Sequence, residues 1–329
     1  MNDETAIVRG VGLLLLLCVL GGAILFATRK SDVEDVPSVT SETTLYEVPA
    51  TFDLRYYPYY GTLSSGAQDV YAKAYAAASA HETEFEVSAS VGDCKAGCEA
   101  MFMDHPEFFW LSSSYTYSFV EGTDEVTSVV LETYDFAATE AGLSKALADF
   151  NSAANEVLSS CPSNGSVFDK EVAIHDALNS SVTYASSAEY GQSAYSALVC
   201  GTSVCAGYSK AFQYLMQQEE IPCYYVTGTA IGFEGDSAAH AWNIVKIGNA
   251  YCNIDVSWDD TIGEVFGQAE YPFFNVTDAD FEATHSRSSE SSLLAACTDS
   301  SYMYSNVNGG TITVGDIVIE DGVVTIMGN

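Results

Sequence analysis

The chain has 329 residues, of which 48% are hydrophobic and 12% aromatic, so it can bury a sizeable core and is not disordered. Its 45 acidic residues outweigh 11 basic ones and give a formal net charge of −34. A field of this sign repels nucleic acid, so we expect no nucleic-acid partner. The negative charge is explained by a need for solubility, or by neutral or cationic substrates.

Residues 10–28, GVGLLLLLCVLGGAILFAT, form a run of 19 residues without a charged side chain. This length is close to the roughly 20 apolar residues that cross a bilayer as a helix. We therefore predict a transmembrane helix or an uncleaved signal anchor behind a short tail at 1–9, or a secreted protein if the signal is cleaved. Arg9 before the run, with Arg29 and Lys30 after it, mildly opposes export and leaves a cytosolic orientation as an alternative.

The remaining chain favours export. It is acidic and poor in lysine, and seven of the nine cysteines remain when Cys18 and Cys205 are set aside, a usage typical of oxidising compartments. Seven is odd, so at least one of these thiols is free, and the sequence does not give the pairing. We expect a single-pass protein of the cell membrane whose folded body lies outside the cytoplasm.

The linker at 29–50 is acidic and contains two prolines, and a mainly helical N-terminal region is predicted at 51–165. Apolar residues at helical spacing predict helices over 68–81 and 139–161, and the pattern continues from Cys94 to Phe102. The composition of 126–136 instead predicts a strand.

A catalytic core is predicted at 166–290. It begins with a helix at 169–184, and after a turn and a second helix it continues with strand-like runs at 222–230, 240–248 and 250–258. The C-terminal segment, 291–329, contains alternating residues around Glu-Asp-Gly and predicts a small β-hairpin. Helices followed by an antiparallel sheet indicate an α+β fold.

Cys205 lies in GTSVCAGYSKAF, residues 201–212, where a turn gives way to a helix. The first turn of a helix presents unpaired amides and the positive end of the dipole, which favour a thiolate and can hold an oxyanion. The thiol also falls on the apolar stripe with Tyr208 and Phe212, so a buried structural cysteine fits the position equally well. We expect Tyr208 to pack and Gly207 to let the helix approach the sheet closely.

Two later runs favour chemistry at this cysteine. Strand alternation in HAWNIVKIG places His240 and Trp242 on one face. Alternation in NIDVSWDD places Asp255 with Asn253 and Ser257, so on neighbouring strands Asp255 can hydrogen-bond His240. A carboxylate that orients an imidazole, and an imidazole that takes a thiol proton, complete the set that a cysteine nucleophile requires.

The successive motifs GTSVCAGYSKAF, IPCYYVTG, HAWN and YCNIDVSWDD resemble those of the bacterial transglutaminase-like superfamily, thiol enzymes with a papain-like fold. The resemblance covers roughly residues 170–285. It implies that Cys205 is the nucleophile, His240 the general base and then acid, and Asp255 the orienting carboxylate of an acyl-thioester mechanism. Ser257 stands where many relatives have Thr, and we expect little effect from this difference.

The candidates for the oxyanion donors and for the wall of the cleft are less defined. The Cys205 amide is one oxyanion donor by position, and Tyr195 or Tyr190 is a candidate for the other, whereas Trp242 and Trp258 are candidates for the cleft wall or for the core. We expect no cofactor and no metal. Cys94, Cys98 and His105 lack a fourth zinc ligand, so a disulfide or simple burial is the better reading of the two thiols.

The function expected from these residues is acyl transfer at peptide or side-chain amides, with hydrolysis favoured and protein cross-linking as the alternative. A non-catalytic surface module that keeps the fold for binding is a further alternative. The expected partner is a protein or peptide, with cell-wall peptides as one class, and the membrane through the N-terminal helix.

Overall fold

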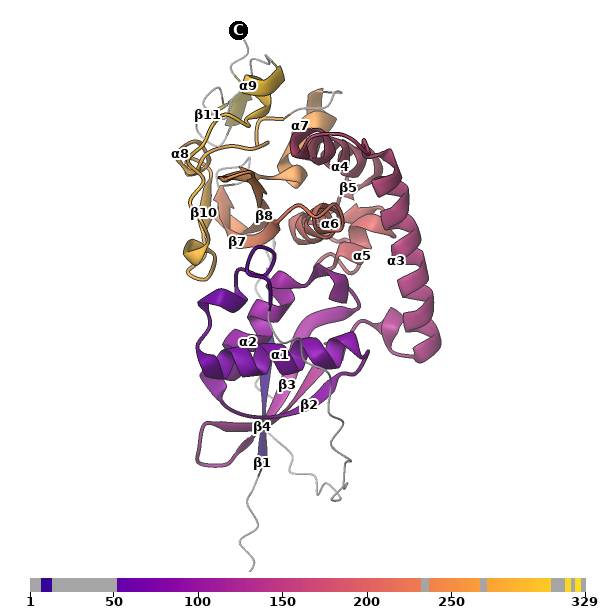
Figure 1. Cartoon of the computed structure of the whole chain (residues 1–329), viewed down its shortest axis with the longest axis vertical. Helices are drawn as coiled ribbons and strands as arrows, with labels where there is room; N and C mark the ends of the chain where they lie inside the picture. The colour runs from indigo at the N-terminus through magenta and orange to yellow at the C-terminus, as the bar shows by residue number, and fades with distance from the viewer. Residues whose placement is uncertain are drawn as a thin grey trace, which may run out of the picture.

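The computed structural model describes residues 7–13, 52–231, 237–266, 271–308, 317–320 and 323–326. Figure 1 shows two halves stacked along the longest axis, with the N-terminal half in indigo to magenta and the C-terminal half in pink through orange to yellow. Helix α3 runs along one side and joins the two halves.

The N-terminal half combines helices with a sheet. Its elements are η1 (Tyr60–Thr62), α1 (Ser65–Ser79), β2 (Glu84–Ser90), α2 (Val91–Asp104), η2 (Pro106–Phe108), β3 (Leu111–Val120), β4 (Glu125–Thr133), η3 (Asp135–Ala137) and α3 (Glu140–Ser160). The helices begin at polar caps: the Ser64 side chain accepts from the Ala67 amide and the Thr139 side chain from the Gly142 amide. The three helices expected from apolar spacing are present.

The sheet of this half is larger than the sequence analysis predicted. Strands β1 (Ile7–Leu13), β3, β4 and β2 lie in the order β1-β3-β4-β2, all antiparallel. Only β4 was expected, at 126–136. The region is therefore mixed, because alternating buried residues along β3, such as Leu111, Tyr115 and Tyr117, form a second hydrophobic face against α2.

The N-terminal apolar run is only partly described. Residues 10–13 lie in strand β1, paired with β3 from Gly10 opposite Tyr117 to Leu13 opposite Ser114. These four residues are extended rather than helical, because the outer edge of β3 supplies backbone hydrogen-bond partners. Residues 14–28 and the linker at 29–50 lie outside the described residues. Within the described ranges, no helix has the length and apolar character needed to span a bilayer.

The C-terminal half is built around helix α6. Its elements are α4 (Val167–Ser181), β5 (Thr183–Tyr184), α5 (Ala194–Leu198), β6 (Thr202–Ser203), α6 (Cys205–Gln218), β7 (Cys223–Ile231), β8 (Ser237–Ile247), β9 (Ala250–Ile254), α7 (Val256–Phe266), α8 (Asp278–Phe281), β10 (His285–Arg287), η4 (Ser291–Leu293), α9 (Tyr304–Asn308), β11 (Ile317–Glu320) and β12 (Val323–Ile326). Strands β11 and β12 pair antiparallel, with Glu320 opposite Val323.

The sheet of this half is antiparallel, in the order β10-β7-β8-β9. The short strands β5 and β6 pair parallel to each other just before α6. Helix α6 packs on β7 and β8 and also contacts α4, α5 and α7. This mixed helix and antiparallel-sheet architecture confirms the α+β class and agrees with a papain-like core, in which a central helix packs on a sheet.

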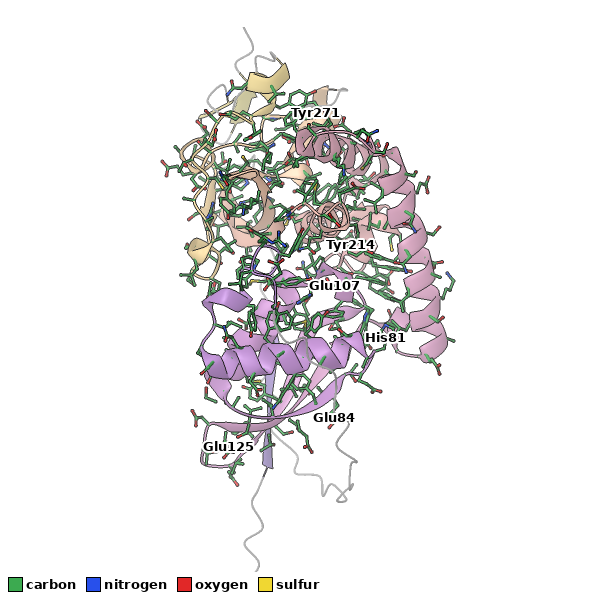
Figure 2. The ribbon with its side chains drawn as sticks, in the orientation of Figure 1. His81, Glu84, Glu107, Glu125, Tyr214 and Tyr271 are labelled. Carbon is green, nitrogen blue, oxygen red and sulfur yellow. The ribbon has the colours of Figure 1, made fainter. Side chains whose placement is uncertain are left out.

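The two halves share one hydrophobic core and are joined by buried hydrogen bonds. Tyr59 Oη donates to Tyr225 O at 2.7 Å, and Gln213 Nε2 of α6 donates to Met103 O at 3.0 Å. Figure 2 shows Glu107 and Tyr214 at the junction between the halves. Because α6 is held from both sides, the N-terminal half is part of the scaffold that positions its first turn.

Candidate active site

Cys205 is the first residue of α6 and is fully buried. The preceding N-cap residue is Val204, which makes no side-chain capping bond. A valine cannot accept a hydrogen bond, so the N-terminal amides of this helix are not satisfied by the side chain that usually caps them. The helix end beside Cys205 therefore keeps the positive potential that favours an anion.

Hydrogen bonds tie this first turn to the sheet. Ser209 Oγ donates to Cys205 O at 2.8 Å, and Asn243 Nδ2 of β8 donates to Ser209 O at 2.9 Å. The same amide nitrogen lies 3.2 Å from Tyr224 O on β7. The predicted stripe of Cys205, Tyr208 and Phe212 is buried, but so is nearly every residue from 205 to 216, because α6 is surrounded on all sides. The stripe alone could not have shown which way the thiol faces.

Gly207 has a different role from the one predicted. A Cβ at this position would lie 2.0 Å from Ser203 Oγ, 2.5 Å from Ser196 Oγ and 2.8 Å from Ser193 O. The glycine therefore brings α6 close to α5 and to strand β6, and not to the β10-β7-β8-β9 sheet. Tyr208 packs as expected, and its hydroxyl donates to Asp260 Oδ2 at 2.6 Å.

His240 and Asp255 lie together, as the neighbouring-strand model predicts. Strands β8 and β9 are antiparallel, with Asn243 opposite Ile254, so the residue after β9 lies beside the upstream part of β8. His240 Nε2 is 2.5 Å from Asp255 Oδ2, and both side chains are buried. The carboxylate thus fixes the orientation of the imidazole and engages its Nε2 atom.

Asp255 does not lie on a strand, and the alternation predicted through Trp258 is wrong beyond Ile254. The chain turns into helix α7 at Val256. Asp255 Oδ1 accepts from Ser257 Oγ at 2.7 Å and from the Trp258 amide at 3.1 Å. This is the geometry of a helix N-cap, so the carboxylate holds the helix with one oxygen and His240 with the other.

The charge state of Asp255 follows from these contacts. Burial alone would raise its pKa, but the positive field of His240 and the hydrogen bonds from His240 and His285 outweigh that effect and lower the pKa well below its usual range. Asp255 is therefore ionised at neutral pH. An ionised carboxylate is the form that accepts hydrogen bonds from imidazole N–H groups.

His285, the first residue of β10, is a member of the site that the sequence analysis missed. Its Nε2 lies 3.1 Å from Asp255 Oδ2, its Nδ1 lies 2.7 Å from Thr284 Oγ1, and its ring stacks on Phe281 at 3.8 Å. Burial lowers the pKa of His285 to about 4, so the ring is neutral. The only available signal was a histidine among the chain's five, at the end of the motif FEATH.

Both tryptophan candidates pack around the imidazoles. Trp242 lies on the same face of β8 as His240, with ring centroids 6.2 Å apart and planes at 24°. The Trp258 ring lies 5.6 Å from His240 and 4.7 Å from His285. Trp242 is fully buried, whereas Trp258 retains 9% exposure. These rings exclude water from the His240–Asp255 pair, which strengthens its electrostatics.

The two tyrosine candidates have their described contacts elsewhere. Tyr190 Oη donates to Asp135 Oδ1 at 2.8 Å, and the Tyr195 ring stacks between Phe136 at 4.3 Å and Phe109 at 5.6 Å. Both side chains therefore support the contact with the N-terminal half. The loop between them approaches the start of α6 at Gly191, where an added Cβ would lie 3.1 Å from Val204 Cγ2.

The other cysteines show no pairing among the described residues. None of the eight cysteines in the described ranges, all except Cys18, forms a disulfide. Cys94 and Cys98 are buried in α2, and His105 instead contacts Tyr71 Oη at 2.8 Å and Glu107 Oε1 at 2.7 Å. Burial, and not a disulfide, is the structural outcome for Cys94 and Cys98.

Comparison with known proteins agrees with the geometry. Residues 151–256 match the family model of the transglutaminase-like superfamily. This range contains Cys205, His240 and Asp255. No curated protein matches the chain.

Three solved structures show some similarity. One is a TGase, with 14% identity over 42% of this chain and 42% of that chain and a TM-score of 0.31. A candidate cysteine protease from Cytophaga hutchinsonii has 18% identity over 44% of this chain and 53% of that chain, with a TM-score of 0.29. A candidate protease from Parabacteroides distasonis has 11% identity over 44% and 36%, with a TM-score of 0.26. Each match spans about half or less of the other protein, so their activities are not transferred to this chain.

Proposed function

We propose that this chain, which carries a domain of the transglutaminase-like superfamily at residues 151–256, is a thiol enzyme that performs acyl transfer at amide carbonyls. The observation that carries the proposal is the buried His240–Asp255 hydrogen bond beside the sheet on which α6, headed by Cys205, is packed. A thiol, an imidazole and an orienting carboxylate are the groups that activate a cysteine nucleophile.

In the proposed mechanism, His240 uses its two nitrogens differently. Nε2 is held by Asp255, so Nδ1 is the atom that takes the proton of the Cys205 thiol. The sulfur then attacks the amide carbon, and the proton passes from His240 to the leaving amine. The product of this step is a thioester on Cys205 and a free amine.

The oxyanion formed in the attack requires donors. The backbone N–H of Cys205 at the start of α6 is one, and we propose the Gln192 side-chain amide as the second, because Gly191 brings this loop against Val204. Gln192→Ala is then expected to lower turnover about 10²–10³-fold. Tyr195→Phe, which retains the stacking with Phe136, serves as the control and is expected to have little effect.

Hydrolysis is the favoured fate of the thioester. Water deprotonated by His240 would release a carboxylic acid, as in a peptidase or amidase, whereas a lysine amine would give a new amide and a cross-link. Protein or peptide substrates suit either outcome, and the net charge of −34 favours cationic or neutral ones, including cell-wall peptides.

The test is incubation of the protein with a peptide library and an added primary amine, read by mass spectrometry against a Cys205→Ala control. Shortened or deamidated peptides support hydrolysis, and amine adducts support cross-linking. Identical spectra for the two proteins would contradict enzymatic activity on these peptides and favour a binding module that retains the fold.

We further propose that the body is held outside the cytoplasm by residues 10–28, as a single-pass anchor in which residues 10–13 leave their pairing with β3, or, after cleavage, as a secreted protein. The support is the uncharged run of 19 residues and the acidic composition of the chain. External protease should digest the body on intact cells. Survival of the body until the cells are lysed would indicate the cytosolic orientation.

A further inference from the structure

Three ligand-bearing side chains converge on one point of the site. His240 Nε2 and His285 Nε2 lie 2.5 Å and 3.1 Å from the same oxygen, Asp255 Oδ2. The three ligand atoms are all within 4.8 Å of one another, and all three residues are buried. They come from β8, the β9–α7 junction and β10, so the sheet fixes their separation.

The donor set is one that transition metals prefer. Two imidazole nitrogens and one carboxylate oxygen bind Zn²⁺ at about 2.0–2.2 Å. A tetrahedral ion therefore needs its ligand atoms to be about 3.3 Å apart. The two separations from Asp255 Oδ2, 2.5 Å and 3.1 Å, are shorter than this value, and the two Nε2 atoms lie at most 4.8 Å apart. An ion can therefore enter once both imidazoles move slightly away from the carboxylate.

Both the carboxylate and the second histidine are already oriented by outer partners. Asp255 Oδ1 is held by Ser257 Oγ and the Trp258 amide. Thr284 Oγ1 lies 2.7 Å from His285 Nδ1 and donates to Phe281 O at 3.4 Å. When the metal takes His285 Nε2, the ring proton can sit on Nδ1 and be accepted by Thr284. Such outer hydrogen bonds orient metal ligands in proteins.

We propose that His240, Asp255 and His285 form a Zn²⁺ site that inhibits the thiol enzyme. The ion takes the Nε2 atoms of both histidines, whose single ring protons then lie on Nδ1. It thereby removes the Asp255 hydrogen bond that orients His240 and leaves no free Nδ1 lone pair to accept the thiol proton. Entry is at the edge where His240 and Trp258 retain 6% and 9% exposure. The zinc site is inferred from the geometry of the three ligands and their outer partners alone, whereas its inhibitory effect rests on the proposed function.

The experiment measures Zn²⁺ binding by isothermal titration calorimetry on the full chain carrying Cys205→Ala. This variant retains all three ligands but cannot perform thiol chemistry, so binding is tested independently of catalysis. We expect one Zn²⁺ per chain. Adding His285→Gln should weaken binding more than about tenfold, and adding His81→Gln, at an exposed histidine, should leave it unchanged. Absence of binding to Cys205→Ala, or equal affinity after His285→Gln, would overturn the site.

A second variant covers the case in which His285→Gln does not fold. Thr284→Val removes the outer partner of His285 and is expected to weaken zinc binding about 10–100-fold. The inhibitory effect is read on the protein with Cys205 intact, as slower alkylation of this thiol when Zn²⁺ is added and recovery with a chelator. Zinc that binds without slowing alkylation would overturn the inhibition but leave the metal site standing.

Discussion

Asp255 serves two structures at once. One carboxylate oxygen caps α7 through the Trp258 amide, and the other faces both His240 and His285. The hydrogen bond to the Trp258 amide already fixes the Asp255 side chain. Asp255 therefore loses little further side-chain entropy when it orients His240. Asp255 thus supplies both the fixed position and the negative charge that orient His240.

Asp255→Asn separates these two roles. The asparagine oxygen can still cap α7, so the melting temperature should change little. Its amide would donate to His240 Nε2, which leaves the ring proton on Nδ1 and removes the base that the thiol needs. We expect turnover to fall about 10³–10⁴-fold. Measurement of activity and thermal unfolding together checks this, and a variant with near-normal activity would contradict the assigned role.

Glu171 of α4 is an acidic side chain buried far from solvent in the structure. Its Oε2 accepts from Asn275 Nδ2 at 2.7 Å, whereas Oε1 has no hydrogen-bond partner. Burial raises its pKa to about 8 from 4.5. The folded chain therefore retains a proton that the unfolded chain loses above pH 4.5, so stability falls as the pH rises from about 4.5 to about 8.

Glu171→Gln should remove this dependence. From the raised pKa we expect Glu171 to cost about 2 kcal/mol more at pH 7 than at pH 5, and the variant should reduce that difference. Urea unfolding at both pH values measures it. Glu84→Gln, at an exposed residue of β2 that Figure 2 labels far from α4, is the control. An unchanged pH dependence in Glu171→Gln would show that Glu171 is ionised in the folded chain.

At the level of elements, the sequence predicted the parts of the site that periodicity determines. The helix at Cys205 and the strands carrying His240 and Cys252 follow from local pattern. The helix that begins after Asp255 could not be predicted in this way. When a helix N-cap directly follows a strand, the first helical residues show the same apolar and polar alternation as the strand. His285 could not be predicted, because its position depends on the pairing of β10 with β7, which only tertiary structure shows.

The position of α6 depends on Gly207. Gly207→Ala would place a methyl group 2.8 Å from Ser193 O, a backbone atom, and closer still to two serine hydroxyls. We expect a loss of about 1–3 kcal/mol in unfolding free energy because α6 must shift. The same shift should slow the reaction of Cys205 in the protein that still folds.

Gly92→Ala is the matched control for this prediction. Gly92 lies in the first turn of α2, and an added Cβ would meet only Ser90 Oγ, at 3.7 Å. Since alanine favours helix by up to about 1 kcal/mol over glycine, this variant should be neutral or slightly more stable. Equal destabilisation by both changes in thermal unfolding would contradict the close approach assigned to Gly207.

At the scale of the whole molecule, the net charge destabilises the folded state and the hydrophobic core stabilises it. A formal charge of −34 in one chain produces self-repulsion that the shared core must offset. Because salt screens charges over about 8–10 Å at physiological strength, we expect the melting temperature to rise with NaCl. A neutral osmolyte at matched osmolality is the control, and a melting temperature that is unchanged or lower in NaCl would contradict this prediction.

The N-terminal half bears on the reactivity of the site through α6. Gln213 and Lys210 of this helix donate to Met103 O and to Ser113 Oγ of the other half. Burial lowers the pKa of Lys210 to about 8, so this contact lies in a dry interface. These contacts show that the region before residue 166 is part of the scaffold that holds α6, which composition alone could not establish.

Carbamidomethylation of the full chain at pH 6, read thiol by thiol by mass spectrometry, tests the central claim most directly. Cys205 is buried and Cys200 is exposed, so accessibility alone would make Cys200 react first. An activated nucleophile reverses this order. We predict that Cys205 reacts faster than Cys200 and that His240→Ala abolishes the difference. A Cys205 that reacts no faster than Cys200, with or without His240, would contradict the claim that this thiol is activated by the imidazole.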